Sequence, residues 1–476
     1  MWKWATRPVH VSWRVAIAAV GFCIGVWLVI YTSTIGTPFA LCLLVAIVLR
    51  PRWLMLVSFV AAVSVGNWYG GMVQATQSAA FGLHGTFATI QGVVKEDPAL
   101  TEKGALTVQL HFLRVDHQTL EGTFWVSTTQ QPLLRGDTIV VRGIVDEGFG
   151  TFVGMMKQAT VVSVTRPVPG DVGRAARDWF AEAIRQGIPE PQASLGIGFL
   201  TGQKSALPHD LAEALQIAGL SHIVVASGYN LTILVRLARR LFVNHSKYLS
   251  VTGSAGMIIG FVAMTGLSPS MTRAGLVSGL SLVTWAYGRS CHPLVMLSLV
   301  AAITLVWQPS YAWGDMGWQL SFAAFFGVMI MAPLLQAYFF GNKPPGILRQ
   351  VLGETVAAHI VTIPIVVAGF GVISHVAVIA NLMIVPLVPL AMLLTFITGM
   401  VGLLAPAISE LVGIPVTWLL TYMTTTAEYL AGLPWAQMEW QPPIWFWGLY
   451  CGGIFAAIYW MRRTTKLSLR EVNPIL

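Results

Sequence analysis

The sequence predicts a polytopic α-helical membrane protein of about 10–12 membrane segments with an inserted small β-barrel domain. Three observations lead to this fold class. Hydrophobic residues make up 55% of the 476 positions and charged residues only 10%, which is typical of a polytopic membrane protein. Long uncharged runs recur, several of them long enough to cross a hydrocarbon core of about 30 Å. Residues 84–165 instead alternate apolar and polar side chains, as half-buried strands do.

The apolar runs fall into two groups. Residues 1–70 hold the N-terminal transmembrane helices, and residues 216–476 hold a second, larger set. We expect one or two runs to be broken or re-entrant, because Pro386 and Pro389 interrupt one of them and such backbone is tolerated only inside protein or beside water. The runs are 13–31, 37–49, 53–70, 218–241, 249–266, 271–288, 293–308, 316–338, 352–371, 376–404, 409–431 and 443–461.

The distribution of Lys and Arg predicts the orientation in the cytoplasmic membrane. With the N-terminus inside, sixteen of the 28 basic residues fall in cytoplasmic segments, and Arg273 is the one basic residue on an outer loop. The other eleven lie in the insert between the two groups of helices. This bias follows the positive-inside rule. Both termini are therefore predicted to be cytoplasmic, and the insert extracytoplasmic.

The insert has two predicted parts. Residues 71–168 contain about five strand-forming stretches, among them "ALTVQLHFLRV" and "DTIVVRGIVDE", separated by turn residues. This pattern favours a barrel of the oligonucleotide/oligosaccharide-binding (OB) type. Residues 169–215 form a helical connector, in which Trp179, Phe180 and Ile184 recur at helical spacing. Two interpretations stay open for this amphipathic helix: it lies on the membrane or caps the bundle, or it packs on the barrel.

Polar groups interrupt several apolar runs. His222, Ser227, Gly228 and Asn230 stand in "GLSHIVVASGYN". Small residues are common where membrane helices touch, so helix packing is one explanation, with Asn230 making a hydrogen bond between helices. A substrate path is the other, because intramembrane polar residues are costly and usually mark such paths.

Four further polar residues extend this pattern. Arg273 and Asp315 both begin spans on the predicted outer side, where the two side chains are able to pair. Gln319 and Asn381 follow in later runs. A pore for a hydrated, charged substrate needs such a lining, and prolines and Ser-Gly breaks supply the unwound backbone that it requires.

Two motifs that would indicate an enzyme fail on spacing. "GFLTGQKS" has three residues between its glycines and Gln203 before Lys204, whereas a phosphate-binding loop needs four residues and a lysine directly after the second glycine. In "VVASGYN", Val225 and Tyr229 replace both glycines of the nucleophile elbow. The sequence therefore predicts no enzyme, no catalytic residue, no metal and no cofactor.

Four motifs in order resemble the ComEC family of competence proteins, which are membrane channels for DNA uptake. "GFLTGQKSALPHDLAEALQIAGLSHIVVASGYN" resembles the start of the family's competence domain, "SPSMTRA" its P-S-x-x-R-A segment, "DMGWQLSFAA" its D-x-G-F-Q-L-S-F-x-A segment, and "NLMIVP" its N-x-x-x-[VI]-P segment. The resemblance covers residues 190–400 well. Asn230 departs from the histidine of many relatives, and the metallo-β-lactamase-like domain found in many relatives is expected to be absent.

The resemblance implies that residues 216–476 form a channel that imports single-stranded DNA across the cytoplasmic membrane during natural transformation. The strand would enter near Arg273, His222 and Asn230 and leave beside Arg236, Arg239 and Arg240. The ordinary topology signal at the inner end of a span is the simpler explanation of these last three residues. A separate DNA receptor, a nuclease and a cytoplasmic ATP-driven motor are expected as partners, besides membrane lipid, and a homodimer is one open assembly.

The barrel offers aromatic side chains that could stack with the bases of such a strand. The candidates are Phe87, Phe112, Phe124, Trp125 and Phe149, although aromatic residues also form barrel cores. Residues 71–165 hold six Lys and Arg against eight Asp and Glu, which is not the basic surface of a strong DNA binder.

Two other functions remain open. A secondary transporter of a small polar or anionic solute also uses buried charges and broken helices, but no convincing internal repeat is visible. A scaffold or receptor without transport activity is the second, and the clustered polar residues within the spans argue against it.

Overall fold

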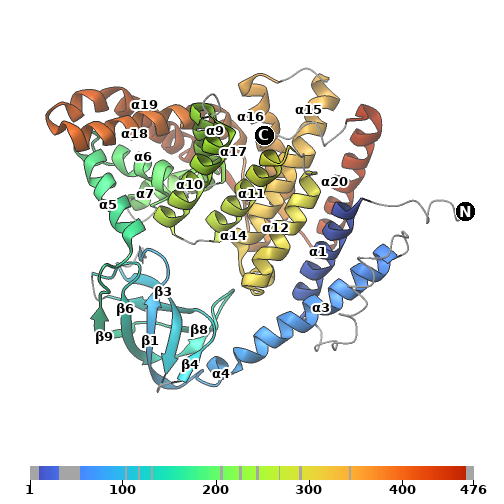
Figure 1. Cartoon of the computed structure of the whole chain (residues 1–476), viewed down its shortest axis with the longest axis horizontal. Helices are drawn as coiled ribbons and strands as arrows, with labels where there is room; N and C mark the ends of the chain where they lie inside the picture. The colour runs from blue at the N-terminus through green and yellow to red at the C-terminus, as the bar shows by residue number, and fades with distance from the viewer. Residues whose placement is uncertain are drawn as a thin grey trace, which may run out of the picture. The chain divides into compact units, whose positions relative to one another are not determined.

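The computed structural model describes the chain apart from residues 1–9, 32–53, 102–103, 116–117, 130–131, 204–206, 225–227, 243–245, 267–268, 289–291, 342–344 and 468–476. The chain divides into two compact units (Figure 1). Unit 1 comprises residues 1–171 and 294–319, and unit 2 comprises residues 172–293 and 320–476.

Within the described residues, seven helices are long and apolar enough to cross a membrane: Val11–Leu28, Met55–Thr76, Tyr248–Thr265, Met316–Phe340, Ile347–Phe370, Ala377–Leu404 and Pro406–Ala431. The protein is therefore a multi-pass membrane protein. The predicted runs 218–241, 271–288 and 443–461 also contain helices, but these do not meet the same criteria, and the run 293–308 forms a shorter apolar helix. The run 37–49 lies outside the described residues.

Unit 1 contains a hairpin of helices α1 (Val11–Leu28) and α3 (Leu54–Thr76). The two helices approach closely because glycines face the partner backbone: a Cβ on Gly25 or Gly66 would overlap a main-chain carbonyl of the other helix. Small residues allow such close contact between membrane helices. Helix α12 (Pro293–Trp307) packs beside this hairpin, and the Tyr69 hydroxyl donates a hydrogen bond to the Val306 carbonyl at 2.6 Å.

Nine strands in the described residues of the insert form one sheet in the order β7-β8-β5-β3-β1-β6-β9, with β2 and β4 paired to β3. Neighbouring strands are antiparallel except for the parallel pair β5 and β8. The strands are β1 (Phe87–Val94), β2 (Ala99–Leu100), β3 (Leu106–Val115), β4 (Gln118–Leu120), β5 (Phe124–Thr128), β6 (Thr138–Ile144), β7 (Asp146–Glu147), β8 (Gly154–Met156) and β9 (Thr160–Thr165). These pairings do not close the sheet into a barrel, so the predicted OB-type closure is not confirmed.

The sheet has its own core, and this core corrects one prediction. In β5 the side chains of Phe124, Val126 and Thr128 are buried, while Trp125 and Ser127 alternate with them at half-buried positions. Phe124 has no exposed surface and packs in the hydrophobic cluster of the sheet. It was wrongly predicted as a candidate DNA contact, because a side chain in the core cannot stack on a base.

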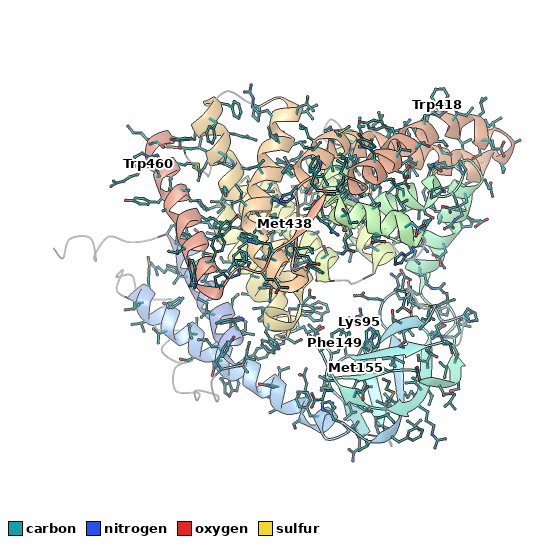
Figure 2. The ribbon with its side chains drawn as sticks, turned by 180° about the vertical axis from the view of Figure 1, so that it is seen from behind. Lys95, Phe149, Met155, Trp418, Met438 and Trp460 are labelled. Carbon is teal, nitrogen blue, oxygen red and sulfur yellow. The ribbon has the colours of Figure 1, made fainter. Side chains whose placement is uncertain are left out.

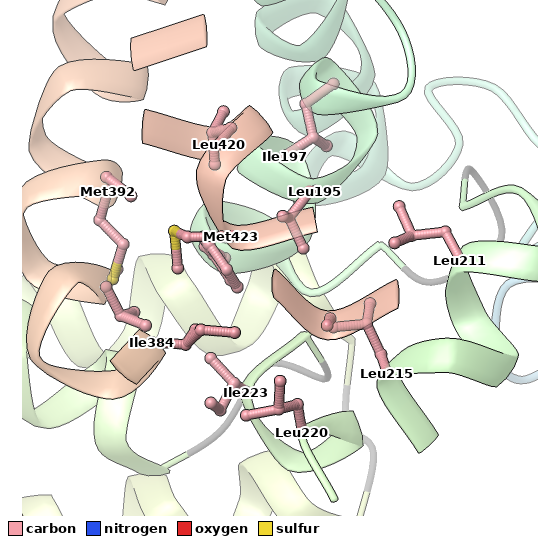
Figure 3. Packing of buried hydrophobic residues seen from close by; sticks show 14 of the residues in the cluster. Leu195, Ile197, Leu211, Leu215, Leu220, Ile223, Ile384, Met392, Leu420 and Met423 are labelled. Carbon is pink, nitrogen blue, oxygen red and sulfur yellow. The ribbon is translucent and has the colours of Figure 1, made fainter. Parts of the chain in front are cut away.

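Unit 2 has a helical core built from both of its sequence segments (Figure 3). Helix α5 (Val172–Arg185) packs on α18 (Val388–Leu404), with the Phe180 and Phe396 ring centroids 5.7 Å apart. This contact agrees with the interpretation in which the amphipathic helix caps the bundle. Helix α6 (Gln192–Thr201) follows and is buried from Ala193 to Thr201. The sequence interpretation missed this buried helix, which it had placed in the connector.

Unit 2 contains ten further α-helices in its described residues, of which α7, α8, α17 and α19 contribute side chains to this core. The ten helices are α7 (His209–Ile217), α8 (Ser221–Val224), α9 (Gly228–Phe242), α10 (Lys247–Thr265), α11 (Pro269–Ala286), α15 (Ala332–Phe340), α16 (Ile347–Phe370), α17 (Ala377–Ile384), α19 (Ser409–Ala431) and α20 (Ile444–Thr465). Between α17 and α18 the chain makes a 3-10 turn at Val385–Leu387. This turn is the break predicted at Pro386, because proline removes a backbone donor and clashes with the preceding turn.

Candidate functional site

Asn230 connects three helices at the start of α9. Its side chain is fully buried. Its Nδ2 donates to the Phe199 carbonyl of α6 at 3.0 Å and to the Ile223 carbonyl of α8 at 3.4 Å. A buried carbonyl without a donor is costly, so Asn230 stabilises the end of α8 against α6. The packing explanation of this residue is thus realised in the structure, and its role in a substrate path stays a prediction.

Two glycines let the α8–α9 region approach its neighbours. Gly219 has a φ of +69°, and a Cβ there would lie 2.6 Å from the Ala377 Cβ of α17, so only glycine suits both the backbone and the contact. A Cβ on Gly228 would lie 3.3 Å from the Ala274 Cβ of α11. His222 lies between them on the four-residue helix α8, with an exposed side chain. Ser227 lies outside the described residues.

Arg273 is a buried cation within α11. Only 3% of its surface is exposed, and its guanidinium carbon lies 5.5 Å from the ring centroid of Phe322 in α14 (Met316–Phe326). A guanidinium over an aromatic face is attracted by the ring quadrupole. Ala274, the next residue, contacts Gly228. The structure therefore packs the part of α11 that holds Arg273 against the start of α9.

Asp315 and Gln319 shape the corner between α13 (Tyr311–Gly314) and α14. The Asp315 Oδ1 atom accepts a hydrogen bond from the Trp318 amide at 2.7 Å, as a helix N-cap does. The Gln319 Nε2 atom donates to the Ala312 carbonyl at 3.2 Å, and the Trp318 indole donates to Thr304 Oγ1 at 2.9 Å. Asp315 and Arg273 belong to different units, so their pairing stays a prediction.

A loop of the sheet meets this same corner inside unit 1. Gly150 has a φ of +61°, and a Cβ there would lie 2.7 Å from the Gly314 carbonyl oxygen. Its neighbour Phe149 is 49% exposed. The Phe149 ring lies 5.9 Å from the Trp125 ring and 5.1 Å from the Phe152 ring.

We call Trp125, Phe149 and Phe152 the aromatic cluster. Figure 2 shows Phe149 and Met155 at one end of the sheet, and Met155 pairs with Trp125 across strands β5 and β8. Because Gly150 touches Gly314, this cluster lies next to the corner that Asp315 caps. The sequence interpretation did not include Phe152 among the stacking candidates. The alternation of aromatic residues and glycines in "EGFGTFVG" was the available signal.

The other predicted aromatic contacts lie elsewhere on the sheet surface. Phe87 is 65% exposed, and the Arg142 guanidinium carbon lies 5.3 Å from its ring centroid. Phe112 is 76% exposed at a bulge in β3 and has a φ of +51°. A bulge that re-aims an exposed side chain is often functional. Burial lowers the pKa of the neighbouring His111, and the charge of Lys95 lowers it further.

The remaining predicted residues lie on other elements. Asn381 in α17 is buried, and its Nδ2 donates to the Ala377 carbonyl one turn earlier at 2.7 Å. Arg236 is exposed on α9, and its charge acts on Glu354 of α16, whose Oε1 accepts a hydrogen bond from Gln350 at 2.8 Å. The side chains of Arg239 and Arg240 lie outside the described part of the structure.

The fold and this arrangement define a multi-pass membrane protein with buried polar side chains between its helices and a β-sheet insert. The chain belongs to the Competence protein family, whose model matches residues 199–464. It is similar to ComE operon protein 3 of Bacillus subtilis (strain 168), with 26% identity over 208 residues. The match covers 41% of this chain and 25% of that protein, so the chain matches about a quarter of its curated relative's length. No solved structure matches the chain.

Proposed function

We propose that this protein imports single-stranded DNA across the cytoplasmic membrane during natural transformation. Membership in the Competence protein family and the similarity to ComE operon protein 3 support a role in DNA uptake. Within the molecule, the observation that carries the proposal is the buried Arg273 of α11 beside the start of α9. A cation in such a place is costly and usually serves a charged substrate.

The proposed path uses the predicted polar residues in an order from outside to inside. The strand enters where the start of α9 meets α11, near His222, Ser227, Gly228, Asn230 and Arg273. Asp315, Gln319 and Asn381 complete the lining, and Arg236, Arg239 and Arg240 form the cytoplasmic exit. This order rests on the positive-inside orientation, with both termini cytoplasmic and the sheet outside. The protein itself is a channel rather than an enzyme, so a separate motor supplies the directional pull.

The sheet is proposed to be an OB-type domain that contacts the incoming strand. Its pairing order supports this assignment: β1 pairs with β3 and β6, β3 with β5, and β5 with the parallel β8. Residues 157–159 alone separate β8 from β9, which pairs with β6, so one short link bridges the two ends of the sheet. The aromatic cluster is the favoured contact, because the insert carries more acidic than basic residues. Such a charge opposes phosphate binding more than it opposes base stacking on aromatic rings.

A binding experiment tests the role of the aromatic cluster. Trp125→Ala with Phe149→Ala is expected to weaken binding of a fluorescent oligothymidylate by the purified full-length protein at least tenfold, since each stacked base is worth about 1–3 kcal/mol. Fluorescence anisotropy measures the affinity. Trp418→Ala, at a residue of α19 that is 75% exposed, is the control and should leave the affinity unchanged. If Phe87→Ala with Phe112→Ala weakens binding instead, the contact lies on the other surface.

An uptake experiment tests the function itself. Fluorescent DNA should stop outside the cytoplasm in a strain that lacks the protein, and the wild-type gene should restore entry. His222→Ala is expected to lower entry about tenfold or more at matched membrane levels, because this histidine belongs to the proposed entry of the path. The control is His209→Ala, an exposed histidine of α7. Unchanged entry after deletion would refute the proposal, and flux of a small anionic solute would favour the secondary transporter.

A further inference from the structure

Helices α16 and α20 run antiparallel, and both pack on α15. Strand β10 (Val372–Ser374) directly follows α16 and pairs with β11 (Gln437–Glu439), which directly precedes α20. The Tyr450 hydroxyl of α20 donates to the Ile360 carbonyl of α16 at 2.9 Å. The helices have 24 and 22 residues, or about 36 and 33 Å at 1.5 Å per residue. The C-terminal end of α20 therefore lies at the level of the start of α16 (Figure 1).

All basic residues of this pair are gathered at that one end. The sequence contains no Lys or Arg between Arg349, in the first turn of α16, and Arg462, in the last turn of α20. Arg349, Arg462, Arg463 and Lys466 are all exposed. No Asp or Glu occurs in residues 335–353 or 450–470, and the next carboxylates along the sequence are those of Glu354 and Glu471.

Exposed aromatic side chains accompany the cations. The guanidinium carbon of Arg349 lies 4.7 Å from the Phe340 ring centroid, and that of Arg463 lies 5.2 Å from the Tyr459 ring centroid. Helix α15, which carries Phe340, packs against both α16 and α20, so the two pairs belong to neighbouring helices. Phe339 and Trp460 are 67% and 62% exposed. We call Phe339, Phe340, Arg349, Tyr459, Trp460 and Arg463 the cation–aromatic patch.

We propose that the cation–aromatic patch binds the headgroups of anionic phospholipids. The guanidinium groups would bind phosphate, and the exposed rings would lie at the headgroup level, where aromatic residues concentrate on membrane proteins. Ile347 and Leu348 of the same end of α16 are 71% and 62% exposed and would contact acyl chains. These apolar neighbours favour a lipid over a nucleic acid, which offers phosphate without hydrocarbon. The proposal does not depend on DNA import.

A lipid titration tests this site. The purified full-length protein in zwitterionic detergent–phosphatidylcholine micelles is titrated with phosphatidylglycerol, and its thermal unfolding temperature is followed. The unfolding temperature should rise with anionic lipid, because a ligand that binds only the folded state stabilises it. Arg349→Ala with Arg463→Ala should weaken the apparent lipid affinity about tenfold or more, as expected for two cations near an anionic surface.

The matched control is Arg142→Ala, which removes another exposed arginine that lies over an exposed ring, but in the sheet. It should leave the lipid titration unchanged. A full lipid response in the double variant overturns the proposal, and so does a wild-type protein that does not respond to phosphatidylglycerol. An oligonucleotide titration in the same micelles is the second arm. A stabilisation by the oligonucleotide that matches the lipid effect and is lost with the two arginines would assign the patch to nucleic acid instead.

Discussion

Valine in place of Gly413 is expected to prevent unit 2 from folding to a stable bundle. Gly413 in α19 faces the main chain of Gly187, and a Cβ would overlap the Gly187 carbonyl group. Overpacking usually costs about 1–3 kcal/mol, and here the obstacle is backbone rather than a flexible side chain. The segment that would be displaced joins α5 to the buried α6. The abundance of the protein in membranes and its unfolding temperature in detergent measure the effect.

The matched control is valine in place of Gly256, in the middle of α10. A Cβ at Gly256 meets nothing within 4 Å, so this substitution adds the same side chain to another candidate membrane helix without a clash. Wild-type abundance and unfolding temperature are expected for this variant. If the Gly413 variant is as stable as the Gly256 variant, the close contact between α19 and the α5–α6 turn is not needed for folding.

The contact between α19 and the α5–α6 turn involves a helix, α6, that the sequence interpretation did not predict. Hydropathy identifies long helices well, because a membrane span must be apolar over many residues. Helix α6 has ten residues, too few to be recognised as a span, and its sequence "QASLGIGFLT" lies in a segment with charges on both sides. Its burial comes largely from α18 and α19, which follow about two hundred residues later in the sequence. A helix of this kind is defined by its tertiary contacts, which hydropathy does not contain.

The sequence also predicted part of the candidate site, namely which polar residues interrupt the apolar runs. The polar interruptions led to Asn230 and Arg273, which lie on helices that pack against each other at Gly228 and Ala274. The sequence did not show which partner each polar group binds. An example is the Asn230 amide, which donates hydrogen bonds to carbonyls of α6 and α8. In β5 the alternation already placed Phe124 and Trp125 on opposite faces, so they could not both face a DNA strand. The apolar partner Val126 indicated which face was the core.

Alanine in place of Arg273 is expected to reduce DNA entry by about two orders of magnitude or more while the protein remains in the membrane. A cation within a membrane segment is costly, so the removal of Arg273 should not hinder insertion of α11. If Arg273 only stabilises the fold, its replacement should lower the abundance or the unfolding temperature of the protein. If Arg273 lies on the substrate path, its replacement should lower the entry of fluorescent DNA at equal protein abundance. We expect this second result.

Two further variants distinguish charge from shape at this position. Lysine in place of Arg273 keeps the positive charge but lacks the planar guanidinium that lies over Phe322, so it should restore part of the entry. Leucine in place of Phe322 keeps an apolar side chain and removes the ring, which should lower entry less than alanine in place of Arg273. Wild-type entry with the alanine variant would show that DNA does not pass this residue. The buried cation would then serve to hold α11 against α14.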